Sequence, residues 1–286
     1  MRDALVAAAR RGAHVAVTLQ ADPYRNSFGA RCNAEAEPVL LGAGAAVTLL
    51  PSDRAPFHLK AAVCDGVAYL DDRNWTMRGP EIVVADDDPA DVALVREALG
   101  GRGGAGAALA TRKDEALRRE IELVDGARDE PVIVETERAA TSPLTRALQR
   151  HALTGARTTL IVGRTSHRSR TEANALAKLA ADGVVVREGG TNQKLALSAD
   201  AAWIGSGNAT GASGRSAGQI DWGMRTRNAA LVGAVRTALE RDVTASRNVS
   251  APALRTAQAM TTHRPRGDGA GGPAGARPAA ACAVPA

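Results

Sequence analysis

Apolar and polar residues follow the same order twice along residues 1–245. Each half opens with a helical pattern and a short apolar strand, repeats that pair, and then ends in a hairpin. The predicted helices cover 2–11, 34–44, 147–155 and 173–183, and the strands that follow them cover 14–19, 45–47, 158–162 and 184–186. Because helices alternate with apolar strands, the pattern predicts an α/β fold in which each half is a largely parallel sheet flanked by helices.

The first hairpin carries polar residues within otherwise apolar strands. His58 and Lys60 are two positions apart, so both side chains leave the same face of an extended strand. Asp65 follows just before the glycine of the turn, and Asn74 follows the second strand. An imidazole, an ammonium group and an amide at one hairpin predict a phosphate site that contains a nucleophile.

The second hairpin repeats this layout 134 positions further along the chain. Its polar residues are Asn192, Lys194, Ser206 and Asn208. Lysine and asparagine recur at equivalent places, whereas an asparagine stands where the first hairpin has His58. A constant offset that also relates the surrounding helices and strands indicates an internal repeat.

The duplicated His-x-Lys-x4-Asp and Gly-Ser-x-Asn layout resembles the phospholipase D superfamily, which includes phosphodiesterases and cardiolipin synthase-like phosphatidyltransferases. The resemblance covers roughly residues 2–245 and is specific in the first motif but degenerate in the second. It implies two repeated halves with one active site at their pseudo-twofold interface. It also implies a two-step reaction through a phosphohistidine, with neither a metal nor another cofactor.

The resemblance also implies roles for individual residues. His58 would be the nucleophile, Asp65 would complete its motif, and Glu81 and its counterpart Asp221 would each orient a histidine. The phosphate would be held by Lys60, Lys194, Asn74 and Asn208, with Ser206 and Asn192 beside them.

The second motif departs from the superfamily pattern at the position of its histidine. An amide such as that of Asn192 cannot move protons near neutral pH, and loss of a general acid costs about 10²–10⁴ in rate. His167, on the loop after an apolar strand, is the internal candidate to supply the proton, and the alternative is that His167 is an ordinary surface residue. Asp65 has no counterpart at the equivalent position, which is Ala199, and the alternative is that Asp200, one residue further on, substitutes for it.

Two acidic residues replace Gly-Ser in the first copy. Asp71 and Asp72 would repel an anionic substrate if both pointed into the site. We therefore expect at least one of them to face solvent or to pair with Arg73.

Composition adds support for an anionic substrate. The chain has 36 basic and 31 acidic residues, a formal net charge of +5, and only four lysines, two of which are Lys60 and Lys194. Rare lysines at both motif positions indicate chemistry rather than compositional bias. No basic block with interleaved aromatic residues and no membrane-length apolar stretch occurs, which favours a phospholipid headgroup ester over nucleic acid and allows peripheral membrane contact.

The repeat also predicts domain boundaries. We expect a first repeat at 1–99, a Gly-rich linker at 100–112, a second repeat at 113–246 and a disordered tail at 247–286. The second repeat opens with a helix at 115–125 and a strand at 131–135 that have no equivalent in the first. We therefore expect an N-terminal truncation of about thirty residues that removes the opening strand. The chain as written would be cytoplasmic, and a signal upstream would make it secreted or membrane-associated.

Three hypotheses follow for function. The chain is an active but asymmetric phosphodiesterase or phosphatidyltransferase, or a homodimer that pairs two first-copy sites, or a descendant that binds anions without turnover. A nucleic-acid phosphodiesterase of the same fold is the alternative within the first hypothesis.

Overall fold

The computed structural model describes residues 1–21, 27–51, 56–73, 82–163, 169–212, 216 and 218–250, and the structural statements below refer to these residues. The first half contains α1 (Arg2–Arg10), β1 (Ala16–Gln20), α2 (Ser27–Gly42), β2 (Ala46–Leu50), β3 (Ala61–Cys64), β4 (Val67–Asp71), β5 (Val83–Asp86) and α3 (Pro89–Leu99). The second half contains β6 (Leu109–Arg112), α4 (Lys113–Gly126), β7 (Val132–Thr136), α5 (Pro143–Leu153), β8 (Thr158–Val162), α6 (Arg170–Ala181), β9 (Val185–Glu188), β10 (Leu195–Leu197), β11 (Ala202–Gly205), β12 (Ile220–Thr226), α7 (Ala229–Ala245) and β13 (Arg247–Asn248). The predicted α/β class is confirmed.

The sheets are mixed rather than largely parallel, which corrects one part of the prediction. The second half has an eight-stranded sheet of order β13-β9-β8-β7-β10-β11-β12-β6. Among its described strand pairs, only β7–β8 and β8–β9 are parallel. The strands β10, β11 and β12 pair antiparallel. Connections too short for a crossover helix can join only antiparallel strands, and the hairpin positions therefore reverse the chain direction.

The first half has the same strand pairs but divides them between two sheets. In β3–β4 Ala61 lies opposite Leu70, and in β10–β11 Leu195 lies opposite Ile204, which is the same register 134 positions later. The strands β1 and β2 form one parallel sheet, and β3, β4 and β5 form another. Within the described residues, no strand of the first half occupies the place that β7 holds between β8 and β10.

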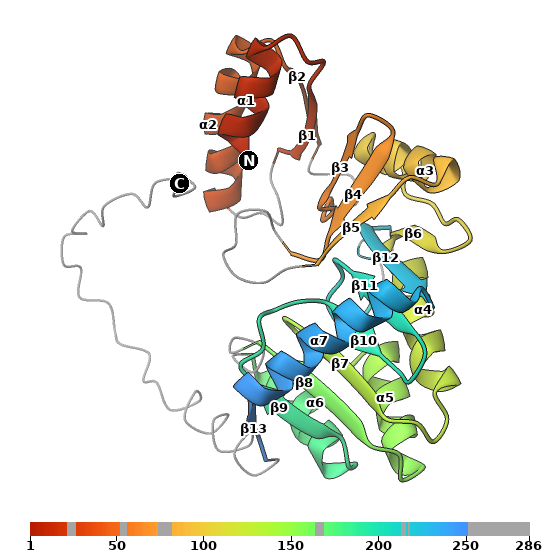
Figure 1. Ribbon diagram of the computed structural model, residues 1–286. Helices are drawn as coiled ribbons and strands as arrows, with labels where there is room; N and C mark the ends of the chain where they lie inside the picture. Colours follow the sequence, from red (N-terminus) through yellow and green to blue (C-terminus); the bar gives the residue numbers. More distant parts are fainter. Residues whose placement is uncertain are drawn as a thin grey trace, which may run out of the picture.

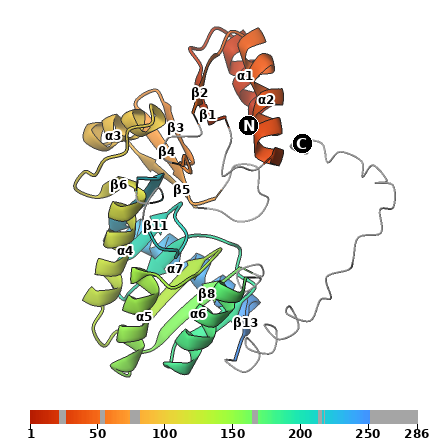
Figure 2. The same cartoon turned by 180° about the vertical axis from the view of Figure 1, so that it is seen from behind.

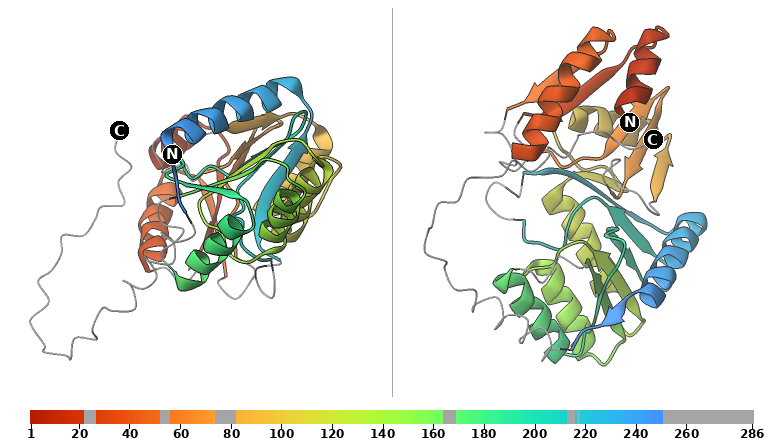
Figure 3. Two further views of the ribbon diagram at one scale, coloured as in Figure 1. Left: turned by 90° about the horizontal axis from the view of Figure 1, so that it is seen from below. Right: turned by 90° about the vertical axis from the view of Figure 1, so that its left-hand side faces the viewer.

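Helices cover both faces of the large sheet. The helices α4, α5 and α6 lie on one face, and α7 crosses the other face over β7, β10 and β11 (Figures 1 and 2). Side-chain N-caps fix where four of the described helices begin: Asp88 caps α3, Ser142 caps α5 through a capping box, Ser169 caps α6 and Asn228 caps α7. The unit formed by α1, α2, β1 and β2 lies at one end of the molecule (Figure 3).

The two halves share one hydrophobic core. Leu70 and Val84 of the first half pack in the same buried cluster as Ile204 and Trp222 of the second. The Trp222 indole Nε1 also donates a hydrogen bond of 2.8 Å to the Asp71 carbonyl across the junction. This packing fixes β3–β5 against β12, whereas α1, α2, β1 and β2 have a separate small core.

The structure adds detail at the expected boundaries. The helix expected at 34–44 is α2, which begins earlier, at Ser27, and ends at Gly42. The last four residues of the Gly-rich segment form β6, which pairs with β12. Residues 247–248 form β13 on the edge strand β9, and residues 251–286 lie outside the described residues. None of the described helices combines the length and apolar character that crossing a bilayer requires.

Candidate functional site

Backbone pairing between the halves brings His58 to Asp221. The segment before β3 forms a parallel bridge between Phe57 and Ile220, and the His58 amide donates to the Ile220 carbonyl at 2.8 Å. The next residue on β12 is Asp221, and its Oδ1 lies 3.3 Å from His58 Nδ1. The two residues are 163 positions apart in the chain. The imidazole of one half is therefore oriented by the carboxylate of the other.

Asp221 is a fully buried carboxylate that is held by several donors. Ser206 Oγ donates to its Oδ1, and Gln219 Nε2 donates to its Oδ2 at 3.0 Å. Burial alone would raise its pKa, but His58, Lys60 and Ser206 outweigh burial and lower the pKa of Asp221. Asp221 thus stays ionised and can hold a proton on His58 Nδ1.

The surroundings of His58 favour the neutral form of its imidazole. Burial lowers the pKa of His58, the charge of Lys60 lowers it further, and Asp221 opposes both effects without reversing them. With the proton on Nδ1 facing Asp221, the lone pair lies on Nε2. This tautomer leaves Nε2 free to attack an electrophile or accept a proton.

Two buried lysines lie in equivalent positions beside this pair. Lys60 Nζ donates to the His58 carbonyl at 2.7 Å, and Lys194 Nζ donates to the Asn192 carbonyl at 2.9 Å. Lys194 Nζ also lies 3.5 Å from Glu137 Oε2, just past the end of β7. Burial, with the charge of Lys194 in addition, lowers the pKa of Lys60 to about 7. Two lysines and an imidazole so placed can hold and attack a phosphoryl group.

Asn192 lies at the carboxyl ends of β7 and β8, on the other side of the site. Its φ is 68°, and its buried Oδ1 has no hydrogen-bond partner among the described residues. A Cβ built on Gly163 would come within 2.1 Å of that oxygen and 3.0 Å of the Glu137 carbonyl, so the asparagine needs a glycine beside it. The position of the second histidine is thus occupied by a side chain without a transferable proton.

A buried carboxyl pair supports the segment that carries Lys194. The Gln193 amide donates to Glu135 Oε1 at 3.3 Å, and Thr191 Oγ1 donates to Asp242 Oδ2 at 2.6 Å. Burial and the hydrogen bond with Asp242 raise the pKa of Glu135 to about 9, while burial of Asp242 is outweighed by its donors, which lower its pKa. Glu135 therefore holds a proton that the pair shares.

Comparisons with known proteins bear on the fold. No family model matches the sequence, and no curated protein matches it. Polyphosphate kinase from Porphyromonas gingivalis superposes with a TM-score of 0.60 at 14% identity, over 88% of this chain and 42% of that chain. Phosphatidylserine synthase from Haemophilus influenzae superposes with a TM-score of 0.55 at 10% identity, over 91% of this chain and 90% of that chain.

The chain therefore shares its fold with these two enzymes. The chain spans less than half the length of the polyphosphate kinase and nearly the full length of the synthase. This confirms the fold that the repeated motifs implied.

Most predicted site residues that the structure describes come together. His58, Lys60, Lys194, Asn192, Ser206 and Asp221 surround one region between the halves. Asn208 lies close by, with its Oδ1 3.5 Å from Thr136 Oγ1 at the end of β7. Three predicted residues, Asn74, Glu81 and His167, lie outside the described residues.

Asp65 does not join the site. It lies exposed at the β3–β4 turn with a φ of 49°, at the far end of β3 from Lys60. Five residues of extended strand span about 16 Å, which is too far for direct contact with the lysine. The structure therefore gives no support to the catalytic role implied by the resemblance.

Asp71 and Asp72 are both buried, so neither faces solvent, and the expected pairing with Arg73 is found for Asp71. Asp71 Oδ1 accepts from the Arg73 backbone amide at 2.9 Å, and Asp72 Oδ1 accepts from the Ile82 amide at 3.2 Å. Burial, reinforced by the neighbouring Asp71, raises the pKa of Asp72 to about 7. Protonation, rather than exposure, reduces the negative charge beside the phosphate site.

Sequence reasoning missed Lys113, Glu137 and Gln219. Lys113 at the start of α4 is buried, donates to Thr210 Oγ1 at 3.0 Å and interacts electrostatically with Asp221. Burial lowers its pKa. The scarcity of lysine was the available signal, because three of the four lysines prove to lie around Asp221 or Asn192.

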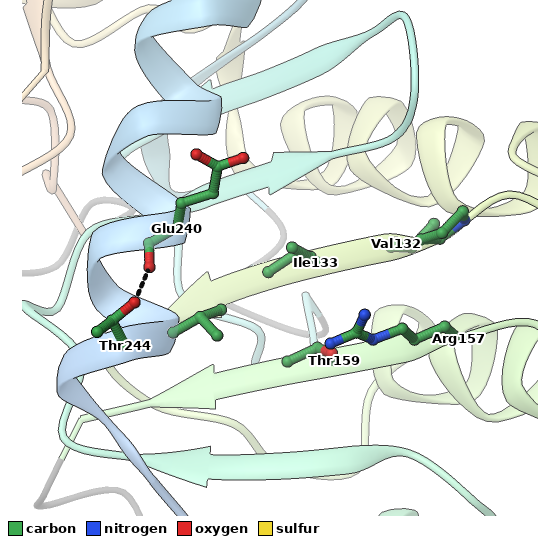
Figure 4. A pocket seen from close by; sticks show the side chains of 8 residues that line it. Val132, Ile133, Arg157, Thr159, Glu240 and Thr244 are labelled. Carbon is green, nitrogen blue, oxygen red and sulfur yellow. Dashed lines mark hydrogen bonds between the residues drawn. The ribbon is translucent and has the colours of Figure 1, made fainter.

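The site does not coincide with the hollow of about 340 Å³ beneath α7 (Figure 4). That hollow lies at the amino ends of β7 and β8 and is lined by Val132, Thr159 and Thr244 among others. Thr244 Oγ1 donates a hydrogen bond to the Glu240 carbonyl at 2.9 Å within α7. Ligands of open α/β sheets bind outside the carboxyl ends of strands, where Glu137 and Gly163 lie. The described residues also include no cluster of three His, Cys, Asp or Glu side chains that could hold a metal.

Proposed function

We propose that this chain is a phospholipase D-like phosphodiesterase or phosphatidyltransferase that acts through a phosphohistidine on a phospholipid headgroup ester. The observation that carries the proposal is the His58–Asp221 pair between two buried lysines. All four residues come from one chain, so this arrangement needs no second copy to complete it.

In the first step His58 Nε2 attacks phosphorus, an N–P bond forms, and the P–O bond to the leaving alcohol breaks. Asp221 stabilises the positive charge that develops on the imidazole ring. Lys60 and Lys194 stabilise the non-bridging oxygens. In the second step water or an alcohol attacks phosphorus, the N–P bond breaks, and neutral His58 is regenerated.

The proton for the leaving oxygen must come from a group other than Asn192. Lys60 has a pKa of about 7 and lies beside the His58 backbone, so it holds a proton that it can release and recover near neutral pH. In this proposal Lys60 protonates the leaving oxygen in the first step and accepts the proton of the attacking water or alcohol in the second.

Two observations support the substrate class. The superposition on phosphatidylserine synthase extends over nearly the whole of both chains, which favours a phospholipid ester. The modest net charge of +5 favours it over nucleic acid. A second candidate, an anion-binding protein without turnover, is favoured by Asn192 and by the buried Asp71 and Asp72.

The test is detection of the covalent intermediate. The purified chain and His58→Gln are mixed in EDTA with phosphatidylserine or phosphatidylcholine vesicles, or with bis(p-nitrophenyl) phosphate. The reactions are quenched in alkali, which preserves phosphohistidine, and the intact proteins are weighed by mass spectrometry. His14→Gln, at an exposed position before β1, is the matched control.

We expect an acid-labile adduct and released product from the wild type and from His14→Gln, and neither from His58→Gln. Vesicle lipids that yield more adduct than the soluble diester would support the phospholipid assignment. A folded wild type that binds vanadate or phosphate but forms no adduct with any substrate would instead establish the anion-binding alternative.

A further inference from the structure

The carboxylates that interact with the two site lysines differ in their exposure to solvent. Three of them are fully buried: Asp71, Asp72 and Asp221. The fourth is Glu137, whose side chain is 36% exposed, although Lys194, the lysine that it contacts, is only 3% exposed. Of these four carboxylates, Glu137 is therefore the one that a ligand in solvent can reach.

Glu137 lies close to both cations of the phosphate site. Its Oε2 is 3.5 Å from Lys194 Nζ, and its charge raises the pKa of Lys60. The next residue, Arg138, is bound elsewhere, because its Nε donates to Glu172 Oε1 at 2.7 Å. Within the described residues, Lys194 is thus the one hydrogen-bonding side chain on the Glu137 carboxylate. A carboxylate accepts about four hydrogen bonds, so Glu137 can accept further donors from a ligand.

The direction of the proposed displacement places one arm of the substrate beside Glu137. In phosphoryl transfer the attacking and leaving atoms lie roughly in line on opposite sides of phosphorus. His58 attacks from the first half, so the leaving oxygen faces the second half. The equivalent position there is Asn192, whose carbonyl binds Lys194 at 2.9 Å, and Glu137 lies on the same lysine. The leaving alcohol therefore extends past Glu137.

The charge of Glu137 restricts which alcohol can lie there. A carboxylate beside a bound phosphodiester repels its negative charge unless a cation lies between or near them. An alcohol that carries only hydroxyl groups supplies no such charge. An ammonium group near the ester oxygen, as in ethanolamine, supplies the charge and donates a charge-assisted hydrogen bond to the carboxylate. The site is thus complementary to a phosphodiester of an aminoalcohol.

We propose that Glu137 binds the ammonium group of an aminoalcohol ester, a specificity that rests on the phosphodiesterase function proposed above. The phosphodiester lies on Lys60 and Lys194, and the ammonium group donates to Glu137. An acceptor alcohol enters where the leaving alcohol departed, so in a transfer reaction Glu137 also selects an aminoalcohol as acceptor. Glu137 is in this proposal a specificity-determining residue and takes no part in bond breaking.

The first experiment measures binding without turnover. His58→Gln, which cannot form the N–P bond, is titrated by calorimetry with two soluble headgroup diesters, glycerophosphoethanolamine and glycerophosphoglycerol. The two ligands share the phosphodiester and differ in the amine. The same titrations are made with Glu137→Gln added to His58→Gln. The matched control adds Glu97→Gln instead, at an exposed glutamate of α3.

We expect His58→Gln to bind the ethanolamine diester about tenfold more tightly than the glycerol diester, as is typical of a hydrogen bond between charged groups. The added Glu137→Gln should bring the two affinities within about twofold of each other, and the added Glu97→Gln should leave the preference unchanged. Equal affinities of His58→Gln for both diesters would overturn the proposal. An equal loss for both diesters in Glu137→Gln would also overturn it, because Glu137 would then act only through Lys194.

The second experiment measures turnover. The wild type and Glu137→Gln are given dihexanoyl phosphatidylethanolamine or dihexanoyl phosphatidylglycerol as monomers, so that the surface charge of a bilayer does not differ between substrates. We expect Glu137→Gln to lower kcat/KM about tenfold for the ethanolamine lipid and to spare the glycerol lipid. An equal fall for both lipids would make Glu137 a proton carrier and overturn the proposal. A wild type without turnover would refute the phosphodiesterase function, and the calorimetry would still decide the amine preference.

Discussion

The substitution Asp221→Asn tests the central geometry of the proposed site. The carboxylate is fully buried, accepts from Ser206 and Gln219, and lies 3.3 Å from the His58 ring. Asparagine preserves the size of the side chain but removes its charge. It also allows an N–H to face the imidazole, which would favour the tautomer with its proton on Nε2.

The expected loss can be worked from that distance. Opposite unit charges 3.3 Å apart interact by about 5 kcal/mol at an effective dielectric constant of about 20. Full loss of this stabilisation from the transition state corresponds to a rate factor of about 10³–10⁴. Retention of a neutral hydrogen bond would reduce the loss, so we expect kcat/KM to fall by about 10²–10⁴.

The assay is the pH dependence of kcat/KM with the substrate that gives the adduct. Asp221 is among the influences that raise the pKa of His58, so its removal should also move the acid limb of the profile to lower pH. A merely structural role would lower activity without that shift. The substitution also removes the carboxylate that interacts with the buried Lys60 and Lys113. The free energy of unfolding should therefore fall by about 3 kcal/mol, and the assays are run well below the melting temperature.

The matched control is Asp200→Asn, an exposed aspartate paired with Arg227. It should change kcat/KM by less than about twofold, since exposed ion pairs contribute little. The reasoning fails if folded Asp221→Asn keeps kcat/KM within about threefold of the wild type.

Two further predictions concern ionisable groups. Lys60 has a pKa of about 7, and in the proposed mechanism it acts in its charged form, so kcat/KM should fall as pH rises through 7. In Lys60→Arg this alkaline limb of the pH profile should disappear, and an unchanged limb would assign it to another group. Glu135 has a pKa of about 9 in the folded protein and near 4.5 in the unfolded chain, so the folded state binds its proton more tightly. Its contribution to the free energy of unfolding is therefore complete below about pH 4.5 and decreases as pH rises toward 9. By calorimetry, Glu135→Gln should therefore melt at a higher temperature than the wild type at pH 8, and the difference should shrink at pH 5. A lower melting temperature of the variant at pH 8 would contradict a buried, protonated Glu135.

The local pattern of the sequence determined the fold class of this protein and which motif side chains share a strand face. Alternating helices and apolar strands predicted an α/β fold, because periodicity reports which face of each element is buried. The spacing of His58 and Lys60, and its recurrence at Asn192 and Lys194, predicted which side chains share a strand face. These are relations between neighbours in the chain, and a constant offset carries them from one half to the other.

Only the tertiary structure decided how the two halves meet. His58 faces Asp221 because residues 57 and 220 pair across the junction, and no local spacing encodes a contact over 163 positions. Burial of Asp72 and the separation of Asp65 from the site depend on packing and on strand length. Ionisation follows from these placements, because desolvation and neighbouring charges set each pKa, and both are properties of the assembled fold.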